Sequence, residues 1–234
     1  MKYSFNTRVR YSEIGVDGRL TPGALIDYFQ DTATFQSEDY GIGLDYMRPF
    51  HYAWILASWQ IDMLRMPSLG EEVVSTTWAY GFEKFYGYRN FTLTGEDGEL
   101  LARANSVWVL MNMEKQRPVK VDPLMLEKYG TEAKIEMEYA PRHILLPEGG
   151  EGQPPIVIES FHLDTNRHVN NARYVELALG CLPEAFEFSR MRVEYKKQAL
   201  LGDVLIPVIS RGGEAVTVTL SDEEKTPYCI VELS

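Results

Sequence analysis

Cysteine and histidine are scarce in this 234-residue chain, which holds two of the first and four of the second. Cys181 and Cys229 are too few for a disulfide framework, and their spacing is wrong for a zinc site. The histidines form no His-x-x-x-His pair of the kind that binds a catalytic metal. We therefore predict no metal site and no cofactor, and we expect both cysteines to pack as small hydrophobic side chains.

Long apolar runs are absent as well. No stretch of about 18 apolar residues occurs, so no transmembrane helix is expected. Residues Met1 to Arg10 are polar and alternating, which differs from the charged and then apolar order of a signal peptide. The content of 45% hydrophobic and 24% charged residues is that of an ordinary globular protein. We expect a cytoplasmic protein with no membrane association.

Positive charge is in short supply. The formal net charge is −11, which argues against nucleic-acid binding, because such binding depends on neutralising phosphates with Lys and Arg. An acidic partner would need a local basic patch, although the same residues could equally form a solvated strand face. The candidates for this patch are Arg142, Arg167, Arg190, Arg192, Lys196 and Lys197.

Strand-like segments follow one another in the first half of the chain. They are rich in β-branched and aromatic residues, and a Gly-Glu-Asp-Gly turn at 95–98 joins two of them. Thr21-Pro22 predicts the start of a helix with Pro at its first position. The predicted strands are residues 3–11, 54–64, 72–82, 86–94 and 100–113.

The second half repeats this order of strand, helix and further strands. Its helix begins near Asn171, and two local alignments support an internal duplication. Residues 17–22 align with 166–171, and residues 69–71 align with 201–203. One long helix against an antiparallel sheet, present twice, is the hotdog fold in its double form. The predicted strands of this half are residues 156–163, 186–198, 204–210, 215–220 and 228–233.

We therefore predict an α+β double hotdog fold, in which two tandem units share one continuous sheet. The first unit is predicted at 1–114 and the second at 153–234. The connecting segment, 115–152, is rich in Pro and Gly and contains a short predicted helix at 123–129. A connection of this length is unusual for a simple loop, so we expect a strap that packs across the sheets.

The segment Asp-Thr-Asn-Arg-His-Val-Asn-Asn-Ala-Arg-Tyr at 164–174 carries the candidate chemistry. Asp164, Asn166 and His168 fall at every second position, so an extended segment would direct their side chains to one side. A carboxylate, an amide and an imidazole together suit acyl transfer by water or by a nucleophile. The alternative is an ordinary polar turn, in which Asp and Asn bond their own backbone.

A helix is predicted directly after this motif, with Asn170 or Asn171 as its cap. Its N-terminus would offer backbone N–H groups and a positive dipole potential to a developing oxyanion. The matching positions in the first copy hold Gly15, Asp17 and Arg19 in place of the Asp, Asn and His of the motif. We therefore predict one site per chain.

The run Leu-Asp-Thr-Asn-Arg-His-Val-Asn-Asn-Ala-Arg-Tyr at 163–174 resembles the active-site segment of acyl-acyl-carrier-protein (acyl-ACP) thioesterases. Members of that family in plants and bacteria carry an Asp-x-Asn-x-His-Val-Asn-Asn-x-x-Tyr string. The resemblance implies that Asp164 activates water or attacks the carbonyl, that Asn166 positions it, and that His168 orients the water or the substrate. It also implies the double hotdog fold, with the acyl chain in the N-terminal unit, and acyl carrier protein bearing an acyl-phosphopantetheine as the partner.

One position departs from the family pattern. Plant members carry Glu-Tyr-Arg-Arg-Glu-Cys on the following strand, and the second Glu belongs to their proposed catalytic set. Here the segment reads Glu-Tyr-Lys-Lys-Gln-Ala at 194–199, so Gln198 replaces the acid. An amide can position a water but cannot act as a base, which puts the base role on Asp164. We expect Glu194 to be a surface partner of the neighbouring lysines.

Three functions are compatible with these residues. The first is hydrolysis of long- or medium-chain acyl-ACP in fatty acid biosynthesis, by a monomer or homodimer. The second is an acyl-CoA thioesterase of the hotdog superfamily, and the third is a non-catalytic module that binds acyl thioesters. The complete motif favours an enzyme, whereas Gln198 is the best support for a binding module, and the fold alone does not choose between them.

Overall fold

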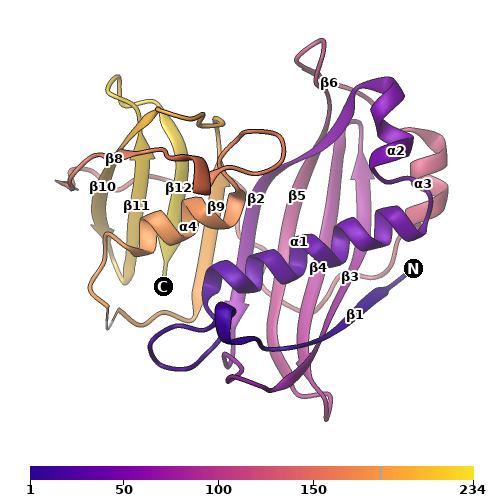
Figure 1. The fold of residues 1–234 in the computed structure, drawn as a ribbon, viewed down its shortest axis with the longest axis horizontal. Coiled ribbons are helices and arrows are strands. Elements are labelled where there is room, and N and C mark those ends of the chain that lie inside the picture. The colour runs from indigo at the N-terminus through magenta and orange to yellow at the C-terminus, as the bar shows by residue number, and fades with distance from the viewer. Residues whose placement is uncertain (185) are drawn as a thin grey trace. The chain divides into compact units, whose positions relative to one another are not determined.

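The structure is a computed structural model that describes residues 1–184 and 186–234. Its internal contacts divide the chain into two compact units, residues 1–57 with 61–139 and residues 58–60 with 140–234. In each unit a helix lies across one face of an antiparallel sheet (Figure 1), as the sequence pattern predicts.

In the first unit, helix α1 (Pro22–Asp39) packs on a sheet with the strand order β1–β3–β4–β5–β2. The helix starts as predicted, because the Thr21 side chain accepts the N–H of Ala24 and Pro22 takes the first position. The strands are β1 (Tyr3–Arg8), β2 (Tyr52–Met63), β3 (Glu72–Glu83), β4 (Tyr86–Gly95), β5 (Leu100–Asn112) and the short β6 (Arg117–Pro118). The small helices are η1 (Tyr11–Glu13), α2 (Leu44–Met47), η2 (Arg48–Phe50) and α3 (Pro123–Tyr129).

In the second unit, helix α4 (Asn171–Leu179) packs on strands β11 and β12. The unit also includes Ser58–Gln60 of β2, and its strand order is β2–β9–β12–β11–β10–β7. The elements are β7 (Glu151–Gly152), β8 (Ile156–Val157), η3 (Ser160–His162), β9 (Arg190–Tyr195), β10 (Val204–Gly212), β11 (Ala215–Ser221) and β12 (Pro227–Leu233).

The loops that lead into α1 and α4 have the same construction. Each follows a short 3-10 helix, and each is closed by an isolated bridge, between Ile14 and Leu20 in the first copy and between Leu163 and Val169 in the second. The two bridges lie as many residues apart as the aligned segments 17–22 and 166–171. The backbone therefore supports the internal duplication.

A second pair of matching turns supports the duplication independently. The Gly70 N–H donates to the Val9 carbonyl at 2.9 Å, and the Gly202 N–H donates to the Ile158 carbonyl at the same distance. Both glycines have a positive φ, 82° and 86°, which only glycine adopts without strain. The Leu-Gly-acid signature in the sequence therefore marks the same turn in both copies.

Two predicted strands of the second unit are shorter than expected. The segment 156–163 is a strand only at Ile156–Val157 and then becomes η3, because the Glu159 N–H donates to the His162 ring instead of a neighbouring strand. The segment 186–198 is a strand only at Arg190–Tyr195. Regular pairing ends after Tyr195, because the N–H groups of Lys196 and Lys197 both donate to the carbonyl of Tyr228.

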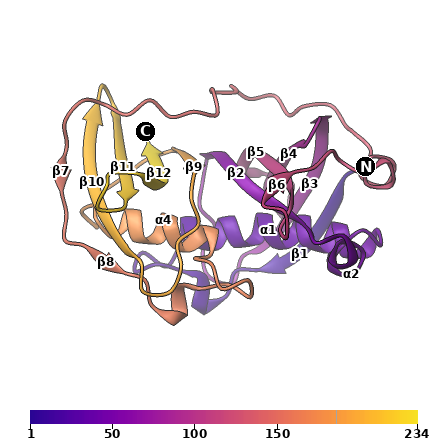
Figure 2. The same cartoon turned by 90° about the horizontal axis from the view of Figure 1, so that it is seen from above.

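The strap runs, in each unit, along the sheet face opposite the helix (Figure 2). In the first unit the Trp78 indole N–H donates to the Ala133 carbonyl at 2.9 Å. In the second unit the Arg192 guanidinium donates to the Pro141 carbonyl at 2.6 Å. Two points of the connecting segment, Ala133 and Pro141, thus contact a sheet strand, and its helix at 123–129 has the predicted bounds.

Candidate active site

The motif residues lie in the loop that precedes α4, which we call the site loop and define as residues 163–170. Within it the Asp164 N–H donates to the His168 carbonyl at 2.8 Å, and the Arg167 N–H donates to the Asp164 carbonyl at 3.0 Å. Arg167 has φ 63°, which turns the chain back on itself. Residues 164–168 therefore form a turn, so the extended segment in which a period of two would direct the three side chains to one side is not present.

The Asp164 carboxylate is built into this turn. Its Oδ1 accepts the backbone N–H of Asn166 at 2.8 Å and the backbone N–H of His168 at 3.2 Å. This is the polar turn that the sequence left open as the alternative. A carboxylate has about four lone-pair sites, so the two bonds fix its orientation while Oδ2 keeps acceptor capacity. The turn therefore presents a fixed carboxylate, which a base or a nucleophile requires.

The other motif residues contact Asp164 through their backbone N–H groups. Asn166 is exposed, and His168 and Asp164 are half-buried. In the part of the chain that the structure describes, no hydrogen bond joins these side chains to one another. Catalytic hydrogen bonds are often long or unformed until substrate is bound, so this arrangement is compatible with a catalytic set that a ligand completes.

The start of α4 differs from expectation in one respect. Asn170 caps the helix, as predicted, since its side chain accepts the Ala172 N–H at 2.8 Å. The Asn170 carbonyl accepts the N–H of Arg173 at 3.0 Å and that of Tyr174 at 3.4 Å. Three backbone groups expected to hold an oxyanion thus already have acceptors. The positive end of the helix dipole is what this terminus offers to the site loop.

Gln198 lies beside the site loop, but it does not lie on a strand. It follows β9 in an exposed turn. Its neighbour Ala199 is held on both sides, because its carbonyl accepts the Val169 N–H at 3.0 Å and its N–H donates to the Tyr174 hydroxyl at 2.7 Å. Gln198 is therefore carried next to the motif by backbone contacts.

Tyr174, the last residue of the motif, is a positioning residue that the sequence reasoning did not single out. Its ring is buried, and burial raises the pKa of its hydroxyl, which therefore stays protonated. The same hydroxyl accepts from Ala199 and donates to the Lys197 carbonyl at 3.4 Å. A buried tyrosine normally places its hydroxyl on a partner, and that rule is the signal that could have identified it.

Glu194 is not the surface residue that we expected. It is buried, and its carboxylate binds the Lys196 ammonium at 3.0 Å and the His143 ring at 2.7 Å. Burial raises its pKa, but the bonds from Lys196, a backbone N–H and His143 outweigh this and leave the pKa lowered. The next residue, Tyr195, points to the opposite face and bonds the start of α4. Glu194 therefore fastens the strap and does not belong to the motif cluster.

Much of the predicted basic patch is engaged in ion pairs. Arg192 pairs with Glu232 at 2.5 Å, and Lys197 pairs with Asp222 at 3.1 Å. Lys196 pairs with Glu194, as described above. These three residues thus lie in ion pairs, which differs both from a free basic patch and from the alternative of a solvated strand face, whereas Arg167 of the motif is exposed.

Among the described residues, no helix is both long enough and apolar enough to cross a membrane. In the same residues, no three His, Cys, Asp or Glu side chains are grouped so that they could bind a metal ion.

Family models match both halves of the chain. The acyl-ACP thioesterase N-terminal domain matches residues 1–129, and the acyl-ACP thioesterase C-terminal domain matches residues 153–228. The chain belongs to the acyl-ACP thioesterase family.

Individual relatives agree with this family. The chain is 27% identical to a chloroplastic palmitoyl-acyl carrier protein thioesterase of Gossypium hirsutum, over 87% of this chain and 53% of the relative. It is 24% identical to the chloroplastic oleoyl-acyl carrier protein thioesterase 1 of Arabidopsis thaliana, over 88% of this chain and 62% of the relative. The chain spans about half the length of the first of these relatives.

The fold was also compared with solved structures. An acyl-ACP thioesterase from Bacteroides thetaiotaomicron superimposes with a TM-score of 0.91 at 22% identity, over 99% of this chain and 96% of that chain. At this identity the comparison shows the fold, and the predicted α+β double hotdog class is confirmed.

Proposed function

We propose that this protein hydrolyses the thioester of long- or medium-chain acyl-ACP and releases free fatty acid and holo-ACP in fatty acid biosynthesis. The observation that carries the proposal is the Asp164 carboxylate, which two backbone N–H groups hold in the site loop of a chain that belongs to the acyl-ACP thioesterase family. Asn166, His168 and Gln198 complete the proposed catalytic set.

The chemistry needs a nucleophile and a group that polarises the carbonyl, but little help for the leaving group. A thiol has a pKa of about 8.5, so a thiolate departs readily near neutral pH. Asp164 acts through Oδ2, either by taking a proton from water as the water oxygen attacks the carbonyl carbon, or by attacking that carbon itself. The carbon–sulfur bond then breaks, and the thiolate leaves and is protonated by solvent. In the first route this step gives the fatty acid directly. In the second route it leaves an anhydride between the acyl group and Asp164, which water hydrolyses to release the fatty acid and restore the carboxylate.

The remaining groups position the reactants. Asn166 holds the water or the carboxylate, and the Gln198 amide positions the water without acting as a base. Since the N–H groups of Ala172, Arg173 and Tyr174 have acceptors, we assign the polarisation of the carbonyl to His168, with support from the helix dipole.

The two units divide the work. We propose that residues 1–114 hold the acyl chain between α1 and its sheet, where Phe29 and Phe91 are fully buried. Residues 153–234 carry the catalytic set, and residues 115–152 connect the two. The protein is proposed to act as a monomer or homodimer.

The location of the protein is part of the proposal. The sequence favours the cytoplasm, whereas the curated relatives are named as chloroplastic. Fractionation of cells that express the protein, followed by detection of the chain in the cytosolic and the membrane fractions, tests this point.

A binding module is the second candidate, and Gln198 is the observation that favours it, because an amide stands where the plant enzymes carry an acid. A panel of acyl-ACP and acyl-CoA thioesters of different chain lengths separates the candidates. We expect release of free fatty acid from acyl-ACP with a kcat/KM above that for acyl-CoA. Preference for acyl-CoA would favour the acyl-CoA thioesterase, and tight binding of acyl-ACP without cleavage would favour the binding module.

A further inference from the structure

One position of the site loop is built differently in the two copies. Arg167 has φ 63°, and Gly18 takes the matching position in the first copy with φ 75°. Both residues donate their N–H back across the same turn, Arg167 to Asp164 and Gly18 to Gly15, each at 3.0 Å. The backbone of this loop therefore demands the left-handed region at this point in either copy.

Glycine meets this demand without strain, whereas an arginine does not. A non-glycine residue in the left-handed region costs about 1 kcal/mol or more. Crowding does not exclude a side chain at this position of the loop, because a Cβ built at Gly18 has no atom within 4 Å. The cost therefore comes from the backbone conformation. The copy that carries the motif thus keeps a strained arginine where the copy without the motif has glycine. Strain that persists at a functional loop points to a role for the side chain.

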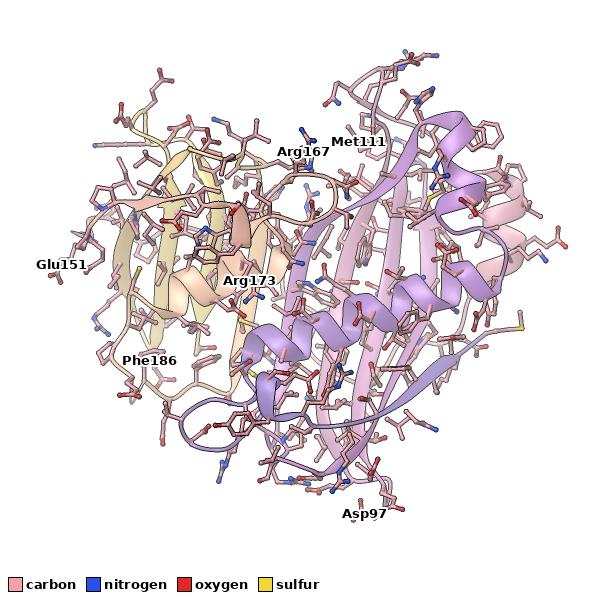
Figure 3. All side chains as sticks on the ribbon, viewed as in Figure 1. Asp97, Met111, Glu151, Arg167, Arg173 and Phe186 are labelled. Atoms are coloured by element: carbon pink, nitrogen blue, oxygen red, sulfur yellow. The ribbon has the colours of Figure 1, made fainter. Side chains whose placement is uncertain are left out.

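The guanidinium of Arg167 is available for such a role. The residue is exposed, and in the described part of the chain its side chain makes no hydrogen bond or ion pair. Figure 3 labels it on the loop that precedes α4. Of the other basic candidates in this unit, Arg192, Lys196 and Lys197 are each paired with a carboxylate.

We propose that Arg167 binds the phosphate of the pantetheine arm that carries the acyl group. The inference rests on the proposed function, since it takes a carrier thioester as the substrate. The thioester must lie at Asp164, and the phosphate is the first charged group along the arm that leads from the site to solvent. A planar guanidinium binds phosphate through two parallel hydrogen bonds. In a chain of net charge −11, one unpaired cation at the site also offsets repulsion of an anionic substrate.

Arg167→Gly is the informative variant, because it installs the residue that the first copy uses. It removes the strain and the charge together, so its thermal stability should be unchanged or higher by up to a few degrees. Lys225→Gly is the matched control. Lys225 is an exposed cation with φ 65° in the turn between β11 and β12, and its replacement should leave the kinetics unchanged.

Three thioesters with the same acyl group separate the sources of the anion: acyl-pantetheine, acyl-4′-phosphopantetheine and acyl-ACP. With Arg167→Gly we expect KM to rise about tenfold for the two substrates that hold a phosphate, the scale of one hydrogen bond between charged groups. The value of kcat should stay the same, and acyl-pantetheine should be unaffected. Arg167→Lys should give an intermediate KM, because an ammonium keeps the charge but cannot donate two parallel hydrogen bonds as the planar guanidinium does.

A loss confined to acyl-ACP would place the contact on the carrier protein and overturn the phosphate assignment. An equal loss on all three substrates would also overturn it, since it would mean a structural role for Arg167. Binding of the thioether analogues of the two small substrates, measured by calorimetry, separates this inference from the proposed function. A phosphate preference that needs Arg167 would persist there even if the protein cleaved no thioester.

Discussion

Replacement of Asp164 by Asn isolates the chemistry of the carboxylate from its structural role. The Oδ1 of Asp164 accepts two backbone N–H groups, at 2.8 and 3.2 Å. The carboxamide oxygen of Asn can accept the same two bonds, so the turn is expected to persist. The amide cannot take a proton from water and cannot attack a carbonyl at a useful rate.

The two expected magnitudes differ enough to be told apart. Loss of base or nucleophile function should lower kcat by roughly 10² to 10⁴, which corresponds to about 3 to 5 kcal/mol of transition-state stabilisation. The cost in folding should be smaller. Bonds to a charged acceptor are roughly twice as strong as neutral ones, and Asp164 is half-buried, so we expect a loss of under about 1 kcal/mol.

Steady-state hydrolysis of acyl-ACP gives the first quantity, and urea unfolding gives the second. Acyl-ACP binding should remain, because the substrate site is intact. An Asp164→Asn protein with near wild-type turnover would refute the assignment of Asp164. A loss of activity that matched a loss of folded protein would show that the carboxylate serves only the turn.

Three further changes test neighbouring parts of the account. Gln198→Glu restores the acid of the plant relatives, and we expect activity between unchanged and several-fold higher. The acidic limb of the pH–rate profile should move to higher pH, because two neighbouring carboxylates raise the pKa of one of them. An unchanged profile would show that Gln198 does not belong to the site. Tyr174→Phe leaves the Ala199 N–H without its acceptor and should destabilise the protein by about 1 to 3 kcal/mol in urea unfolding. The value of kcat should also fall, because the turn that carries Gln198 is displaced. An unchanged stability and an unchanged kcat would contradict the positioning role. Glu194 has a lowered pKa, so its stabilising contribution is present at neutral pH and is lost as pH falls below its ordinary value of 4.5. Glu194→Gln should therefore reduce the Tm at neutral pH and weaken its fall toward low pH, without altering kcat, and a lower kcat at full folding would return Glu194 to the site.

The order of elements could be predicted from the sequence because each element has a local cause. Thr21 and Pro22 start α1, and the glycine turns at Gly70 and Gly202 have signatures that repeat. The strands of the first unit are long and alternate clearly, so their bounds were predicted to within a few residues. The boundaries of β9 could not be predicted in this way, since the strand ends where two N–H groups share one carbonyl of β12.

The geometry of the site could be predicted less well from the sequence than the identity of its residues. The period of two suggested an extended segment, but Arg167 at a positive φ folds it into a turn, and no local signal in an arginine marks that conformation. The role of Glu194 depends on the strap, which lies far away in the sequence and contributes His143. Such contacts arise from tertiary packing, so a pattern within one strand cannot show them.

The most direct test of the central claim, one catalytic site in the second copy, is acyl-ACP turnover in two matched variants. His168→Ala and Arg19→Ala change equivalent positions of the two loops. The backbone hydrogen bonds at these positions, from Asp164 N–H to the His168 carbonyl and from Gly15 N–H to the Arg19 carbonyl, do not depend on the side chains. We expect His168→Ala to lower kcat by roughly 10²-fold or more, and Arg19→Ala to leave it nearly intact. Comparable losses in both variants, at equal folded fractions, would contradict a single site and the duplication argument behind it.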